Sequence, residues 1–164
     1  MPVAVAVVES IALELKSRLD AMIGASGYQT EICEVQRPAR FADFTPRNNQ
    51  IVLTQGQPER VPELDRPGEP PSNAYRQQFL IHCHVMQDER NTDAIDSLLN
   101  AFHADIIKAV ASGSSTWHTF GGYATDAQWQ TVNYIQADGG MDGLQIPLNI
   151  TYRVSEDDMT ELRA

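Results

Sequence analysis

Apolar and polar residues alternate along residues 75–86, and this alternation predicts a long β-strand. After a polar turn at residues 87–91, apolar residues recur every three or four positions as far as residue 110, which predicts a helix directly after the strand. Asn91 or Thr92 can cap that helix, and Lys108 lies in its last turn. One face of the strand carries Tyr75, Phe79, Ile81, Cys83 and Val85, and the other carries Arg76, Gln78, His82 and His84, with Leu80 and Met86 as exceptions.

The remaining segments predict one more helix and four more strands. Residues 8–22 carry a helical stripe that stops at Gly24 and Gly27, and residues 28–35, 50–55 and 128–136 have strand-like patterns. Residues 144–154 alternate most regularly, although Pro147 predicts that this strand lies at a sheet edge or has a bulge. Residues 137–143 (ADGGMDG) have the glycines that a turn with positive φ angles uses.

This order, α-β-β-β-α-β-β, predicts an α+β fold. Short connections favour antiparallel neighbours, so we expect a mostly antiparallel β-sheet with two α-helices packed on one face. The other face is then polar, and if the strands align it carries Gln78, His82, His84, Gln145, Asn149 and Thr151.

Two long loops and a tail interrupt the regular patterns. Residues 56–73 contain five prolines, which disfavour a regular helix or an inner strand. The segment is either an arm that docks on a neighbour or a solvated surface loop. Residues 111–127 combine Gly, Ser and Thr with Trp117, Phe120 and Tyr123, which favours an interface loop over the alternative that these aromatic side chains fold back onto the edge of the core. Residues 155–164 form an acidic tail that we expect to be exposed.

Composition narrows the class of protein. A chain of 164 residues suits a single domain, and a formal net charge of −10 disfavours binding to phosphate backbones. No apolar run approaches the length of a membrane span, and the first residues lack the basic region of a signal peptide. Cys33 and Cys83 lie in predicted strands, so we expect buried, reduced thiols, with a disulfide between them as the lesser alternative.

Little in the sequence indicates catalysis. His82 and His84 project from the same face of a strand, which is a workable metal geometry, and His103, His118 or Asp88 could complete it. Nothing fixes those additional ligands nearby, so two polar residues on a wet face are the simpler interpretation. The sequence has no nucleophile elbow, dinucleotide fingerprint or P-loop. We therefore expect a protein that is not an enzyme and needs no cofactor or metal.

The order of elements over nearly the whole chain resembles the tail terminator and tail-completion (neck) proteins of long-tailed bacteriophages. The resemblance lies in an N-terminal helix (ESIALELKSRL), a long strand (QQFLIHCHVMQ), an acidic turn into a helix (DERNTDAID) and a closing strand (PLNITYRVSEDD). The loops at residues 56–73 and 111–127 are longer than in the simplest members of that family.

The resemblance implies a structural virion protein, assembled in the host cytoplasm. Members form rings, commonly hexameric, that cap the tail tube and bind neck proteins, while DNA passes through the lumen without specific binding. Arg60 and Arg66 on the proline-rich loop could then pair with acidic neighbours, unless Glu59, Glu63 and Asp65 already neutralise them. Trp117, Phe120 and Tyr123 would contact a neighbouring subunit or the tube. The alternatives are a neck connector or minor tail protein, a small metal-dependent enzyme using His82 and His84, and an adaptor that binds a peptide at a sheet edge.

Overall fold

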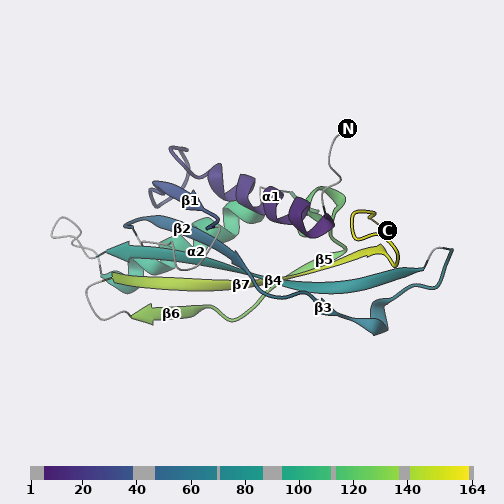
Figure 1. Cartoon of the computed structure of the whole chain (residues 1–164). Helices are drawn as coiled ribbons and strands as arrows, with labels where there is room; N and C mark the ends of the chain where they lie inside the picture. Colours follow the sequence, from purple (N-terminus) through teal and green to yellow (C-terminus); the bar gives the residue numbers. More distant parts are fainter. Residues whose placement is uncertain are drawn as a thin grey trace.

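Two helices cover one face of a mostly antiparallel sheet, so the predicted α+β fold is confirmed (Figure 1). The computed structural model describes residues 6–38, 47–69, 71–86, 94–111, 114–136 and 141–162. The helices are α1 (Val7–Asp20) and α2 (Ile95–Ala111), with two short 3₁₀ helices, η2 (Pro62–Leu64) and η3 (Trp117–Gly122). The strands are β1 (Glu34–Gln36), β2 (Gln50–Gln55), β3 (Glu59–Arg60), β4 (Ser72–Met86), β5 (Asp126–Trp129), β6 (Asn133–Gln136) and β7 (Met141–Ser155).

The two longest strands, β4 and β7, pair along their whole length in the middle of the sheet. The strand order is β1-β2-β4-β7-β5, with β3 also paired with β4 and β6 with β7. The register places Phe79 opposite Leu148 and Ile81 opposite Ile146, and all four side chains are fully buried under the helices. The alternation in these two segments therefore predicted the core face correctly.

Pro147 is not at a sheet edge, because β7 has partners on both sides. The segment predicted as one strand at residues 128–136 is instead two strands, β5 and β6, which both pair with β7. The break between them lies opposite Pro147, whose carbonyl accepts a hydrogen bond from the Gln130 N–H at 2.9 Å. Since proline has no N–H to donate, an uninterrupted neighbour would lose a ladder bond at this point.

Gly143 lies inside β7, not in a turn with positive φ as predicted. Residues 137–140 of the predicted turn are outside the described residues, and Gly143 pairs with His84 of β4 and Ile135 of β6. A Cβ atom at position 143 would lie 2.8 Å from the backbone carbonyl oxygen of Cys83. Glycine is therefore needed here for the close approach of two backbones.

Replacing Gly143 by alanine is expected to destabilise the fold by about 1–3 kcal/mol, because the backbone of β4 must move to admit the new methyl group. Urea unfolding of the purified variant measures this loss. Gly56→Ala is the control, since its Cβ would meet nothing closer than 3.8 Å. Equal stability of the two variants would contradict the steric explanation.

The N-terminal half differs from the prediction at two places. Only Glu34–Gln36 of the predicted strand at residues 28–35 forms a strand. Cys33 is therefore exposed, and its thiol donates to the carbonyl of Asn48 at 3.0 Å, whereas Cys83 is buried and burial raises the pKa of its thiol. Both thiols are free, and positive φ angles at Gly24 and Gly27 follow α1 as predicted.

The second helix begins at Ile95, with the Leu98 N–H donating to the carbonyl of Ala94. The predicted cap residues Asn91 and Thr92 lie outside the described residues, and Lys108 occupies the last turn as expected. In the part of the chain that the structure describes, no helix combines the length and apolarity needed to cross a membrane.

Candidate assembly interface

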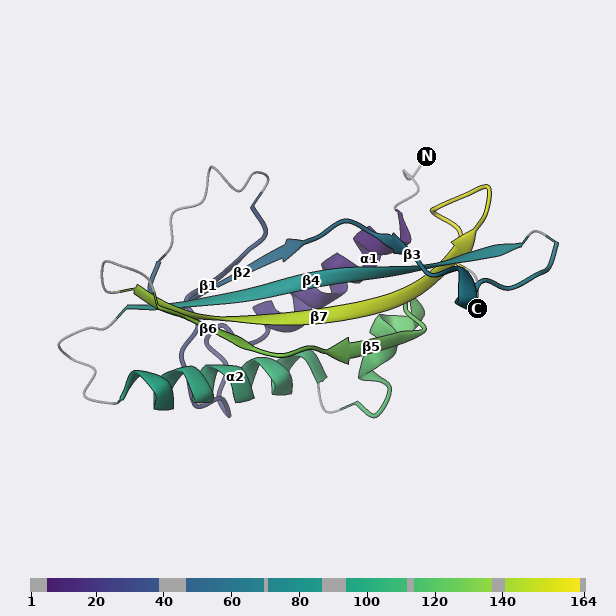
Figure 2. The same cartoon turned by 90° about the horizontal axis from the view of Figure 1, so that it is seen from below.

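Among the described residues no element covers the sheet face opposite the helices, which we call the uncovered face, and its charged side chains gather at one end. Figure 2 looks onto this face, where β4 and β7 pass in front of α1. The register brings Gln78 opposite Asn149 and His82 opposite Gln145, as expected for the polar face. None of the side chains that β2, β4 and β7 direct to this face is an aspartate or a glutamate, although the chain has 22 of these residues. The carboxylates of this face come instead from its flanking strands, at Glu59 of β3 and Asp126 of β5.

The histidine pair lies on this face without the arrangement of a metal site. The imidazoles of His82 and His84 are nearly parallel, with an interplanar angle of 8° and centroids 6.4 Å apart, so they do not converge on one point. Among the described residues, no group of three or more His, Cys, Asp or Glu side chains is placed to hold a metal ion. His103 is on α2 and His118 packs against Trp117, while Asp88 lies outside the described residues.

Burial lowers the pKa of both imidazoles, and the charge of His84 lowers the pKa of His82 further. Their cross-strand neighbours are Val52 and Gln145 for His82, and Gln50 and Gly143 for His84, none of which titrates. The unfolded chain therefore binds more protons at these two residues than the folded chain does below the ordinary histidine pKa of 6.5. The stability that they contribute is complete above that pH and is lost as the pH falls through the folded-state pKa values.

The variant with His82→Gln and His84→Gln is expected to lose less stability than the wild type between pH 7.5 and pH 5.5. Urea unfolding at the two pH values measures the difference, because the slope with pH reports the difference in bound protons. His103→Gln, on the helix layer, is the control. A double variant with the same pH slope as the wild type would contradict the effect of burial on these two imidazoles.

A polar cavity of about 340 Å³ opens on the uncovered face, at the end of the sheet near β3 and β5. Arg76 and Arg153 line it, and within the described residues neither forms an ion pair. The Arg153 Nε donates to the carbonyl of Leu64 at 3.1 Å, and both burial and the nearby charge of Arg66 lower its pKa. The other lining residues are Leu64, Thr125, Asp126, Gln128, Asn149 and Thr151. We call this cavity the basic pocket.

The proline-rich segment is ordered against its own sheet and forms one wall of the basic pocket. Its strand β3 pairs with the beginning of β4, and an isolated bridge joins Arg66 to Ser72. Arg60 forms an ion pair with Asp65 at 2.9 Å, and the Asp65 carboxylate also accepts a hydrogen bond from the Ala74 N–H at 2.7 Å. Arg60 is therefore neutralised within its own segment, which is one of the two alternatives considered from the sequence.

The loop with Trp117, Phe120 and Tyr123 folds mostly onto the edge of the core. This is the alternative that the sequence analysis set against an interface loop. Phe120 is fully buried and so offers no surface to another chain, and the Arg18 guanidinium lies 4.6 Å from its ring centroid. Trp117 is half-buried and stacks on Trp129 with centroids 5.7 Å apart. Tyr123 is 40% exposed and, with Leu13, lines a shallow depression, so its contact with a partner stays a prediction.

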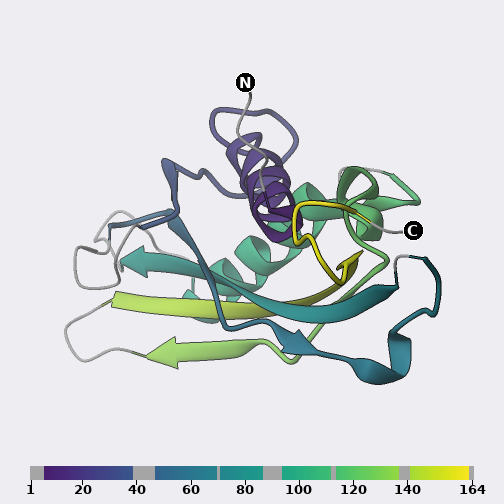
Figure 3. The same ribbon diagram turned by 45° about the vertical axis from the view of Figure 1, so that its right-hand side comes forward.

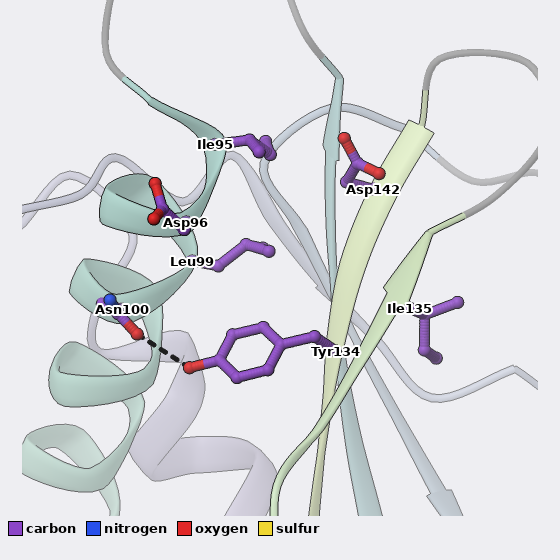
Figure 4. A pocket seen from close by; sticks show the side chains of 7 residues that line it. All are labelled: Ile95, Asp96, Leu99, Asn100, Tyr134, Ile135 and Asp142. Carbon is purple, nitrogen blue, oxygen red and sulfur yellow. Dashed lines mark hydrogen bonds between the residues drawn. The ribbon is translucent and has the colours of Figure 1, made fainter.

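A second cavity, of about 320 Å³, lies between α2 and the edge strand β6 (Figure 4). Tyr134 reaches across to α2, where its hydroxyl donates to the Asn100 side-chain oxygen at 2.7 Å, while Ile135 points away from the helix. The carboxylates of Asp96 and Asp142 also line the cavity. Exposed apolar side chains beside an unpaired strand edge are typical of a place where another chain adds.

Comparison with known proteins adds no assignment, since no family model matches the chain and no curated protein is significantly similar to it. The evidence on function therefore comes from the surfaces described above: the uncovered sheet face, the basic pocket and the edge of β6. The basic pocket was missed from the sequence, although Arg76 and Arg153 both fall at polar positions of long strands. That signal was too weak, because only the cross-strand register brings the two strands' arginines to one cavity.

Proposed function

We propose that this chain is a structural virion protein that forms a ring, hexameric by analogy with the family it resembles, at the head-proximal end of a phage tail. The ring caps the tail tube and joins it to the neck. The observation that carries the proposal is the uncovered sheet face, to which the central strands β2, β4 and β7 direct no carboxylate in a chain of net charge −10. Depletion of charge is the compositional mark of the core of a protein interface.

The shape of the sheet supports a contact between copies. The helices cover only one side, and Figure 3 shows both of them above the long strands. A sheet face and an edge strand on one side, facing a helix layer on the next copy, make a head-to-tail contact, and such contacts close into rings. The acidic lumen of that ring would repel phosphates, so DNA would pass through without specific binding.

Leu80 lies in the centre of the uncovered face and provides a test of the proposal. With tail tubes from the virus that encodes it, the wild type is expected to form a closed oligomer at one tube end, seen by negative-stain electron microscopy. Leu80→Glu is expected to abolish the oligomer while keeping the wild-type circular dichroism spectrum. A wild type that binds no tube, or a Leu80→Glu variant that assembles normally, would contradict the proposal.

A second candidate function is an adaptor that binds a peptide as an added strand. The observation in its favour is the edge of β6, with exposed Tyr134 and Ile135 beside an apolar cavity. Isothermal titration with peptides from neighbouring virion proteins distinguishes it, because saturable binding without any oligomer would favour the adaptor. A neck connector or minor tail protein would use the same surfaces at another position in the virion. The metal-dependent enzyme gains no support from the parallel histidine pair.

A further inference from the structure

Two arginines, Arg76 and Arg153, lie on the uncovered face, and among the described residues neither forms an ion pair, although Glu59 of β3 lies opposite Arg76. Arg76 and Arg153 line the basic pocket together, and Arg66 is near enough for its charge to lower the pKa of Arg153. Among the described residues, Asp126 is the carboxylate that lines the pocket, and it accepts a hydrogen bond from Gln128 at 2.9 Å without forming an ion pair with Arg76 or Arg153. Two arginines that share a pocket without an ion pair to its carboxylate can bind a further anion.

The acidic segment of the chain, residues 156–161, lies on the other side of the sheet. Its backbone is held beside α1 by a hydrogen bond from the Val7 N–H to the Met159 carbonyl at 3.2 Å, and Figure 3 shows it next to the beginning of that helix. Glu156 and Asp157 are exposed, and in the described part of the chain their carboxylates form no ion pair. Glu156 and Asp157 therefore present their carboxylates on the helix side, away from Arg76 and Arg153 of their own chain.

We propose that the basic pocket of one copy binds the acidic segment of the next copy, through Arg76 and Arg153 on one side and Glu156 and Asp157 on the other. This inference rests on the proposed ring. Figure 1 shows β3, which lies beside the pocket, and the C-terminal segment on opposite sides of the long strands at the same end of the molecule, so each copy offers one partner in each direction. That arrangement is head-to-tail and can close into a ring without leaving either surface unused.

The chemistry of the pocket suits carboxylates. Arginine pairs with a carboxylate through two parallel hydrogen bonds, and the threonine and amide side chains around the arginines supply further polar contacts. The partial burial of Arg153 strengthens such a pair, because charges interact more strongly away from bulk water. A nucleic-acid phosphate is a different ligand with similar geometry, and the experiment below separates it from a second copy.

Charge reversal with rescue tests the pairing. The pocket variant carries Arg76→Glu and Arg153→Glu, the tail variant carries Glu156→Lys and Asp157→Lys, and the combined variant carries all four changes and keeps the net charge of −10. Assembly on tail tubes is measured by sedimentation and electron microscopy. We expect the pocket and tail variants to assemble at least tenfold more weakly than the wild type, and the combined variant to assemble like the wild type.

Four controls make the outcome specific. Circular dichroism shows that each variant is folded, and Arg76→Glu alone, at an exposed position, keeps the test available if the double change at the pocket unfolds the chain. A pocket variant that also carries Glu31→Lys and Asp96→Lys regains the net charge of −10 without changing the acidic segment, and it must still assemble poorly. The variant Lys16→Glu and Arg47→Glu, which removes the same charge elsewhere, must assemble normally.

The failures of the two proposals are distinguishable. Normal assembly of the pocket variant, or rescue by the changes at Glu31 and Asp96, would overturn the pairing and leave the ring intact. A wild type that never assembles on tubes would overturn the ring and the pairing with it. If the pocket variant assembled normally but lost binding to a short DNA duplex, the ligand would be a phosphate and the inference would be wrong.

Discussion

Replacing Phe120 by alanine is expected to lower the free energy of unfolding by about 3–5 kcal/mol. The Phe120 side chain is fully buried, and it packs between the core and the Arg18 guanidinium. Arg18 also donates to the carbonyls of Val110 and Trp117, at 2.8 and 2.9 Å, so losing the aromatic side chain loosens the contact between α1 and the end of α2. Urea unfolding measured by fluorescence gives the difference.

Tyr123→Ala is the matched control for Phe120→Ala. Tyr123 follows in the same loop but is 40% exposed, so we expect a loss within about 0.5 kcal/mol. Phe120 has a positive φ of 46°, and alanine bears a similar backbone cost there, so the difference reports the lost side chain. If Phe120→Ala kept wild-type stability but failed to assemble, the interface prediction made from the sequence would be right after all.

Replacing Asp105 by alanine is expected to destabilise the fold by about 2–4 kcal/mol, because three donors lose the buried carboxylate that accepts from them. Asp105 is 2% exposed, and one of its carboxylate oxygens accepts hydrogen bonds from the backbone N–H of Gln29 and of Thr30 and from the Thr30 hydroxyl, at 2.7–2.8 Å. This carboxylate therefore ties α2 to the turn after α1. Thermal and urea unfolding both measure the loss.

Asp96→Ala is the control for Asp105→Ala, since Asp96 is on the same helix but is exposed. Its carboxylate accepts only from the Ser97 N–H among the hydrogen bonds of the described residues. We expect its loss to change the free energy of unfolding by about 0.5 kcal/mol or less. An equal effect of the two substitutions would show that the charge of the helix, and not the three hydrogen bonds of Asp105, stabilises this region.

The fold class could be predicted because the two longest strands report their faces directly in the sequence. In β7, Leu144, Ile146 and Leu148 alternate with polar residues or Pro147, and burial of every second side chain fixes both the period and the register of the core face. The same logic placed His82 on the uncovered face. Such local patterns depend on no distant residue, so the sequence alone carries them.

The remaining features depend on contacts that no local pattern encodes. The break between β5 and β6 lies opposite Pro147, which is far along the chain from the residues that it interrupts. Phe120 looked exposed because glycine and serine surround it, yet Arg18 from the first helix covers it. Likewise Arg76 and Arg153 line one pocket only because β4 and β7 pair in this register.

The central claim is that the protein completes the head-proximal end of a phage tail. Electron microscopy of particles from cells infected with a phage that carries an early stop codon in this gene tests it most directly. We expect overlong tail tubes, because a terminator controls tail length, whereas tails of normal length beside unattached full heads would indicate a neck connector in the same virion. Normal, infectious particles would contradict a structural role in the tail.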